Sequence, residues 1–186
     1  MKTILSLLLL LSVPAFGAEV AGVKLDDKAR VGNAELVLNG AGVRKRVVFQ
    51  VYAMGLYLPK KTSSAAEAIG GEGPKRVAIH MLRDVGAATF TDALADGIRE
   101  NHTEAEVKAH EPRVKMLAAT MAEVKEAKKG MVIVLDMAGG AVQMSIDGKP
   151  AGKPIDGAEF SRALLRIWLG DKPVQEDLKK ALLGGG

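Results

Sequence analysis

Residues 47–59 read VVFQVYAMGLYLP, and this stretch decides the fold that the sequence predicts. Valine, tyrosine and phenylalanine are enriched in strands, and Pro59 cannot donate a ladder hydrogen bond, so a strand is expected from Val47 to Leu58. Apolar residues occupy both faces of that strand. Because both faces must then be covered, we expect the strand to lie centrally in a sheet.

Two shorter strands are expected before it, at residues 20–25 and 34–38, with a polar turn at 26–28 between them. The next residues, 39–42, read NGAG and predict a tight turn, because glycine adopts backbone angles that other residues avoid. Val43-Arg44 follows, and not the Gly-Lys-Ser/Thr sequence of a phosphate-binding loop. A nucleotide-binding loop is therefore not expected here.

After the central strand the pattern alternates between helices and strands. Apolar residues at every third or fourth position predict helices, and β-branched or alternating runs predict strands. We expect strands at 75–82, 131–137 and 141–146, and helices at 62–69 and 173–183. Between the first two of these strands we expect two helices: one contains Phe90, Leu94 and Ile98, and the other is opened by Thr103 and Glu106 and is bent or restarted by Pro112. After the strand at 141–146 we expect a helix that Asp156 and Glu159 cap. Strands joined mostly by hairpins, with helices between the groups, predict an α+β fold: an antiparallel sheet with helices on one face.

One expected helix carries the most regular apolar stripe in the chain, formed by Phe160, Ala163, Leu164, Ile167 and Trp168. A stripe of this width must face the sheet. We therefore expect Trp168 to be buried.

The N-terminal residues 1–18 have the three-part layout of a secretory signal peptide. A basic start is followed by an apolar run at 4–11 and by small residues that permit cleavage after Gly17 or Ala18. The apolar run is shorter than the roughly 20 residues that cross a bilayer. We expect a signal peptide, one domain at 19–186, and a periplasmic or secreted protein.

Composition narrows the classes of partner. The 186 residues contain no cysteine, so neither a disulfide framework nor a thiolate metal site is available. Nucleic-acid binding would need clustered cations and stacking aromatic residues, whereas the net charge is +4 and aromatic residues make up 4% of the chain. No nucleic-acid partner and no membrane span are expected, and the sequence does not predict the oligomeric state.

Common catalytic and metal-binding patterns are also missing. His102, Glu106 and His110 share one helix face, but no fourth ligand accompanies them, so a solvated face is the preferred interpretation and no metal site is expected. Ser145 lacks the glycine-flanked turn that exposes a serine nucleophile. No cofactor is expected.

Four segments resemble the chalcone isomerase family, and specifically its bacterial, exported branch. The segments are LNGAGVR at 38–44, FQVYAMGLYL at 49–58, RVAIH at 76–80 and FSRALLRIWLGDKPV at 160–174. The resemblance implies a large antiparallel sheet, a layer of helices on one face, and a ligand cleft between them.

The resemblance also implies a role for an arginine on the glycine-rich segment. Plant members close a ring by adding a phenolate oxygen to an unsaturated ketone, an intramolecular-lyase reaction, whereas a related branch binds fatty acids without catalysis. Both branches use this arginine, which by motif is Arg44. A guanidinium carries a permanent charge and paired donors, which suit either an enolate or a carboxylate. Because the link to Tyr52 is shorter than in plant enzymes, Arg46 is the alternative.

Position 52 favours the binding branch. The ring-closing enzymes have threonine there, whereas the fatty-acid-binding branch resembles this chain in having tyrosine at Tyr52. Where plant enzymes place a tyrosine and an asparagine on the cleft helix, this chain has Thr89-Phe90 and Asp96-Gly97. The resemblance thus implies a cleft that lacks two polar catalytic groups. The ligand-binding candidates are Arg44, Tyr52, Met54, Thr89 and Phe90, with Val51 and Leu94 as further lining residues.

Geometry adds one requirement to these candidates. A straight strand would separate Arg44 from Tyr52 by about 26 Å, so the chain must fold back between them, near Lys45 and Arg46, if both are to hold one ligand. Three hypotheses follow in order: a non-catalytic binder of a fatty acid or similar amphipathic carboxylate, an isomerase of the intramolecular-lyase class, and an interaction protein without a ligand.

Overall fold

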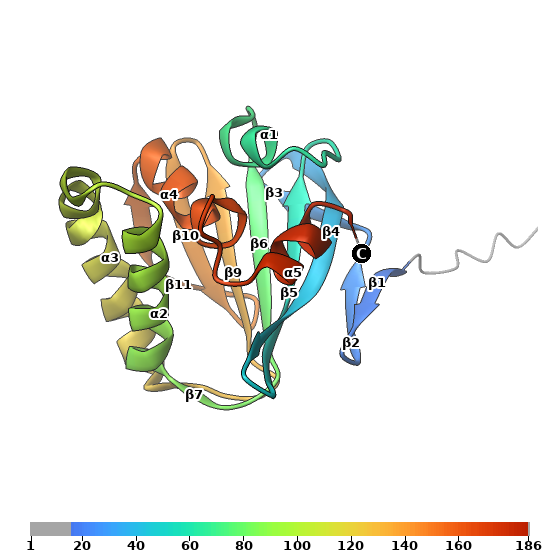
Figure 1. Cartoon of the computed structure of the whole chain (residues 1–186), viewed down its shortest axis with the longest axis horizontal. Helices are drawn as coiled ribbons and strands as arrows, with labels where there is room; N and C mark the ends of the chain where they lie inside the picture. The colour runs from blue at the N-terminus through green and yellow to red at the C-terminus, as the bar shows by residue number, and fades with distance from the viewer. Residues whose placement is uncertain (1–15, 186) are drawn as a thin grey trace, which may run out of the picture.

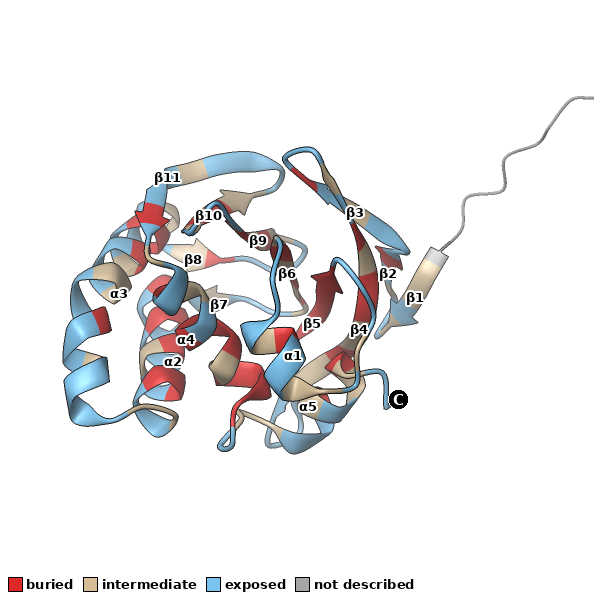
Figure 2. Ribbon diagram, turned by 90° about the horizontal axis from the view of Figure 1, so that it is seen from above, coloured by how far each residue is buried: buried red, intermediate tan, exposed pale blue. Residues whose placement is uncertain are grey.

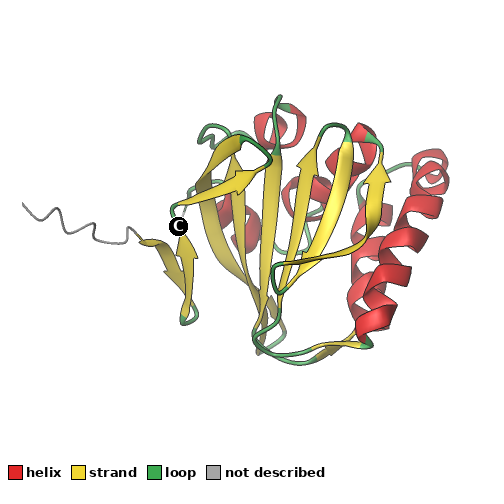
Figure 3. Ribbon diagram, turned by 180° about the vertical axis from the view of Figure 1, so that it is seen from behind, coloured by secondary structure: helices red, strands yellow, loops and turns green. Residues whose placement is uncertain are grey.

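The protein is a curled antiparallel sheet with its helices on one face, as the computed structural model shows for residues 16–185 (Figures 1 and 3). Within these residues, seven strands form the main sheet in the order β11-β10-β9-β6-β5-β4-β3. Their bounds are Lys28–Val31 (β3), Ala34–Arg46 (β4), Phe49–Leu58 (β5), Lys75–Met81 (β6), Val132–Ala138 (β9), Ala141–Ile146 (β10) and Lys149–Asp156 (β11). The expected α+β fold is confirmed.

The helices pack along the concave side of this sheet (Figure 2). They are α1 (Ala65–Gly70), α2 (Ala87–Glu100), α3 (Glu104–Val124), α4 (Ala158–Leu169) and α5 (Glu176–Leu182). The stripe of α4 is buried against the sheet, with Trp168 1% exposed, as its spacing predicts. No helix in the described part of the chain is long and apolar enough to span a membrane.

Two small strand pairs flank the main sheet. β1 (Phe16–Val20) and β2 (Val23–Asp26) form a hairpin next to β4, so the strand expected at 20–25 is wrong: the chain turns at Ala21-Gly22. A turn there requires positive φ, which Gly22 adopts at 77°. At the other end, β7 (Val85–Gly86) pairs with β8 (Glu126–Ala127). The expected signal peptide lies outside the described residues except for its last three positions.

The glycine-rich segment 39–42 is part of strand β4 and not the expected turn. A Cβ atom on Gly42 would come within 2.9 Å of Ala181 Cβ and of Leu178 Cδ1, both on α5. Glycine therefore serves close packing of a helix across the strand, not backbone reversal. The actual reversal is a two-residue turn at Val47-Val48.

Strand β5 fits the prediction from its composition. It begins at Phe49, two residues later than expected, and every residue from Tyr52 to Leu58 is buried. It lies between β4 and β6 in the sheet. The expected interior position is therefore confirmed.

Two boundary predictions near the helices are wrong, as is part of a third. Helix α3 runs without a break through the exposed Pro112, so it does not restart there. Helix α4 begins after Gly157 with no side-chain cap, because β11 extends to Asp156 directly before it. Helix α5 begins at Glu176, three residues after Pro173.

Strand β11 was not expected. Its Pro150 and Pro154 weaken the strand signal, but β11 is the edge of the sheet, where proline is tolerated.

Candidate functional site

Arg44 and Tyr52 lie directly opposite each other on β4 and β5. The chain folds back between them, as the argument from strand length requires, although the turn is at Val47-Val48 and not at Lys45-Arg46. Directly opposed residues of an antiparallel pair lie about 5 Å apart between Cα atoms. The register therefore places both side chains on the same face of the hairpin.

A side chain of helix α4 forms a hydrogen bond with the phenol of Tyr52. Trp168 Nε1 donates a 2.9 Å hydrogen bond to the Tyr52 hydroxyl, and both side chains are buried. Burial raises the pKa of the Tyr52 phenol, and the Trp168 hydrogen bond and the Arg44 charge only oppose that shift. The phenol thus stays neutral and keeps its proton. Within residues 16–185 no protein group accepts that proton.

The guanidinium of Arg44 is positioned by Gln175, the residue before α5. Arg44 Nη1 donates to Gln175 Oε1 at 3.4 Å and to the Lys45 carbonyl. Gln175 also accepts from Lys45 N at 2.7 Å and donates to Val43 O at 3.1 Å, so it binds this part of β4 to the start of α5. In the described chain Arg44 forms no ion pair, which leaves its charge available to a ligand.

Of the two candidate arginines, Arg44 is the one beside Tyr52. Arg46 lies opposite Phe49, next to the turn, and is exposed. The structure therefore separates the two: Arg44 lies at the level of the phenol, and Arg46 at the end of the hairpin.

Two of the apolar candidates lie in the buried cluster that contains Tyr52. Met54 and Phe90 are 1% and 6% exposed and belong to the same buried cluster as Tyr52 and Trp168. Thr89, in contrast, is exposed on the outer side of α2, so the structure does not bring it to the others. The cluster is filled by its own side chains, and neither cavity described below is lined by these candidates.

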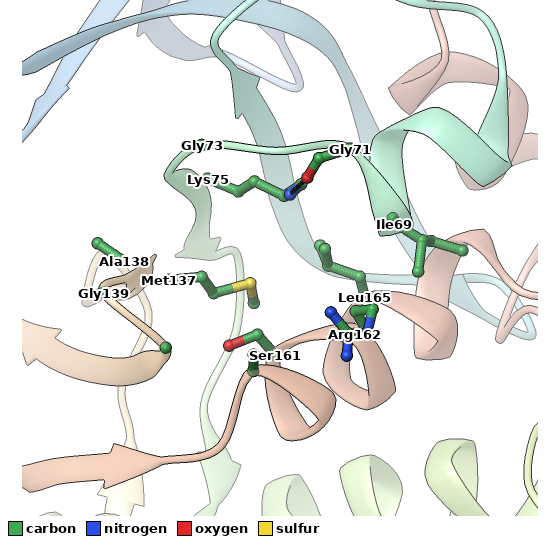
Figure 4. A pocket seen from close by; sticks show the side chains of 13 residues that line it. Ile69, Gly71, Gly73, Lys75, Met137, Ala138, Gly139, Ser161, Arg162 and Leu165 are labelled. Carbon is green, nitrogen blue, oxygen red and sulfur yellow. Dashed lines mark hydrogen bonds between the residues drawn. The ribbon is translucent and has the colours of Figure 1, made fainter.

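A cavity of about 130 Å³ lies at the start of β6, whereas Tyr52 pairs with Met81 at the end of that strand (Figure 4). Lys75 at the start of β6 donates to the Gly71 carbonyl, and Ser161 and Arg162 of α4 line the other side. Burial lowers the pKa of the Lys75 ammonium, and the charge of Arg162 lowers it further. No sequence pattern marked these residues, because Lys75 and Arg162 are brought together only by the packing of α4.

A second hollow, of about 310 Å³, lies on the outer surface of α2 and α3 and includes His102. The Nδ1 atom of His102 lies 2.8 Å from the Ile98 carbonyl, and its Nε2 atom lies 3.2 Å from Arg166 Nη1. His110 is buried against Phe160. In the described part of the chain no three His, Cys, Asp or Glu residues are placed to hold a metal ion.

Comparisons with known proteins agree with this architecture. The chalcone isomerase-like family model matches residues 17–184. The solved structure of a fatty-acid binding protein from Arabidopsis thaliana superposes with a TM-score of 0.69 at 12% identity, covering 87% of this chain and 92% of the other. At that identity the likeness is one of fold. No curated protein matches the sequence.

Proposed function

This chain belongs to the chalcone isomerase-like family, and from that premise we propose that it is a non-catalytic binder of a fatty acid or a similar amphipathic carboxylate. The observation that carries the proposal is the opposed pair of Arg44 and Tyr52. Among residues 16–185, this pair joins a cation that forms no ion pair to a neutral phenol whose proton has no acceptor. Two such donors, side by side, match the two oxygens of one carboxylate.

The apolar part of the ligand fits the region beneath the head group. Tyr52 belongs to the buried cluster that includes Met54, Phe90 and Leu94, so an acyl chain leaving the carboxylate would meet apolar side chains at once. Because Trp168 and Phe90 fill this region, they must move to admit a chain. The Arabidopsis neighbour, whose title names a fatty-acid binding protein, supports the choice of ligand class.

The isomerase alternative has less support from α2. Apart from Thr91, the side chains of this helix that face the interior are apolar or small, including Phe90 and Leu94. The Thr91 hydroxyl donates to the Ala87 and Ala88 carbonyls of its own helix. The polar Thr89 and Asp96 are exposed. Helix α2 therefore adds no acid, base or oxyanion donor to Arg44 and Tyr52, although ring closure would use such groups.

One observation favours the second alternative, an interaction protein without a ligand. Trp168 is hydrogen-bonded to Tyr52 and almost fully buried, so it occupies space that a ligand would need. Ligand binding and a permanently closed interior predict opposite outcomes in one titration.

The titration uses Trp168, the single tryptophan of the chain, as its reporter. A medium-chain fatty acid should change its fluorescence, because the indole contacts Tyr52. Arg44→Ala should weaken binding about 30-fold, through loss of a charge-assisted contact, and Tyr52→Phe about fivefold. Lys75→Met, at the distant cavity, is the control and should bind as the wild type does.

Three results would contradict the proposal. Equal affinity of Arg44→Ala and the wild type would remove Arg44 from the site, and a loss confined to Lys75→Met would move the head group to the cavity of Figure 4. Ring closure of a chalcone clearly above the uncatalysed rate would favour the isomerase.

We also propose that the protein is exported, as in the bacterial branch that it resembles. Cleavage after Gly17 or Ala18 leaves the pairs Glu19–Lys24 and Val20–Val23 of the first hairpin intact. Protein recovered from the cell envelope should therefore begin at Ala18 or Glu19. N-terminal sequencing that finds Met1 would contradict export.

A further inference from the structure

The turn between β4 and β5 exposes three large apolar side chains in succession. Val47, Val48 and Phe49 are 90%, 81% and 57% exposed. In the described chain the remaining exposed large apolar side chain is Met116, on α3. The hairpin tip, defined here as residues 44–50, thus concentrates the exposed apolar surface at one end of the molecule.

The backbone at this tip is poorly suited to valine. Val47 has φ at 56°, in the left-handed region, where a β-branched residue is a rare outlier. Two-residue hairpin turns with positive φ at the first position prefer glycine there. The geometry of the turn therefore does not explain the valine at Val47.

Cations surround these apolar side chains. Residues 44–46 read Arg-Lys-Arg, and the tip contains no acidic residue. Arg83, from the loop after β6, places its guanidinium 4.6 Å from the centre of the Phe49 ring. Lys129 lies on the neighbouring loop, where its backbone N–H donates to the Asp84 carboxylate at 2.7 Å, so one acidic group stands beside Arg83 and Lys129.

We propose that the hairpin tip is a docking surface for a bilayer that contains anionic phospholipid. Its chemistry combines aliphatic and aromatic side chains that can enter the acyl boundary with cations that can pair with phosphates. Its shape agrees, because a convex two-residue turn cannot cover the area of roughly 800 Å² per partner that stable protein interfaces bury.

Docking in this way brings the Arg44–Tyr52 pair to the lipid surface. Arg44 precedes Val47 by three residues, which is about 10 Å along a strand. A tip that enters the boundary by about 5 to 10 Å thus holds Arg44 at the level of the head groups. The docking surface shares Arg44 with the proposed ligand site, and it would shorten the path of a lipid carboxylate to that site.

The test measures binding to phosphatidylglycerol–phosphatidylcholine vesicles and to vesicles of phosphatidylcholine alone. The protein should bind the anionic vesicles and be released by salt. Lys45→Ala/Arg46→Ala should weaken binding about 30-fold, and Val48→Asp about tenfold or more. Met116→Asp, which changes an exposed apolar residue on α3, is the matched control and should bind within about twofold of the wild type.

A residue-specific readout comes from the absence of native cysteine. Val48→Cys and Met116→Cys each give a single labelling site for an environment-sensitive fluorophore. Anionic vesicles should shift the emission of the label at position 48 and leave that at 116 unchanged. All variants share one N-terminus, so residues before Phe16 contribute equally to every measurement.

The proposal is overturned by several outcomes. These are no binding to anionic vesicles, no emission shift at position 48, and equal shifts at both positions. Binding of the tip to an acidic polypeptide, such as polyglutamate, without binding to vesicles would assign the surface to an acidic protein partner instead. None of these measurements uses a fatty acid, so failure here leaves the proposed ligand site standing.

Discussion

The two halves of the β4–β5 hairpin have the same strand geometry and opposite surroundings. The inner half, around Asn39 to Val43, is covered by α5, and its glycines let the helix approach closely. The outer half, from Arg44 to Phe49, ends in exposed valines and cations. The opposed Arg44 and Tyr52 stand at the boundary between them.

This difference separates the residues of the hairpin that stabilise the fold from those that do not. In the inner half each unusual residue has a partner in the fold: Gly40 and Gly42 face α5, and Asn39 bonds to the loop before α1 and to α5. In the outer half the unusual residues, Val47 and Val48, contact solvent. The following predictions test the division in order of expected effect.

Loss of the indole at the boundary should have the largest effect. Trp168→Ala should lower the free energy of unfolding by about 3 to 5 kcal/mol, because it leaves a large cavity beneath Tyr52. Trp168→Phe keeps most of the packing and should cost about 1 to 2 kcal/mol, since the buried phenol loses its donor. Denaturant unfolding measures both. A cost below about 1 kcal/mol for the alanine variant would show that the boundary is not part of the core.

Gly40→Ala should be the next most costly change. Its Cβ would lie 2.6 Å from the Leu182 carbonyl oxygen of α5, and a backbone atom cannot rotate away. We expect a loss of about 3 kcal/mol in the free energy of unfolding, with α5 displaced from the strand. Gly70→Ala is the control, because nothing lies within 4 Å of its Cβ position. Equal stability of the two variants would contradict close packing of α5 on the inner half.

Asn39→Ala should cost about 2 kcal/mol. The Asn39 amide donates to Thr62 O at 3.0 Å and to Leu182 O at 2.7 Å, and it accepts from Thr62 N at 2.7 Å. Removing it leaves these backbone groups without partners in a largely buried position. Asn33→Ala, at an exposed turn, should change stability by less than about 0.5 kcal/mol. If Asn39→Ala were as harmless, the inner half would not depend on this link.

Sequence patterns correctly predicted those elements whose structure depends on residues close together in the chain. The apolar run of β5 and the stripe of α4 are dictated by neighbouring residues, and both elements were correctly predicted. The turn predicted at residues 39–42 is wrong: glycine in a sequence signals a turn, whereas here it lets α5, about 140 residues further along the chain, pack against β4. No pattern within β4 can reveal that helix.

The candidate site divides in the same way. If Arg44 and Tyr52, which the family resemblance pairs, hold one ligand, strand length requires the chain to fold back between them, and the register agrees. The groups that hold this pair, Gln175 and Trp168, lie more than 110 residues further along the chain. Their roles depend on where α4 and α5 pack, which the spacing of residues does not specify. The sequence likewise does not predict the exposed tip, because Val47 and Val48 fit the pattern that predicts a strand over 47–58.

The smallest effect should be a gain in stability. Val47→Gly should raise the free energy of unfolding by about 0.5 to 1 kcal/mol, because glycine adopts the positive φ at this turn without the steric cost that valine carries. Val48→Gly is the matched control: Val48 is not among the residues with positive φ, so glycine there relieves no strain and should leave stability unchanged or lower. Thermal and denaturant unfolding of both variants give the comparison. If Val47→Gly were less stable than Val48→Gly, the valine would be contributing to the fold, and the outer half would resemble the inner one. If Val47→Gly is more stable and binds anionic vesicles more weakly, the same residue opposes folding and favours docking, which is the difference between the two halves reduced to one side chain.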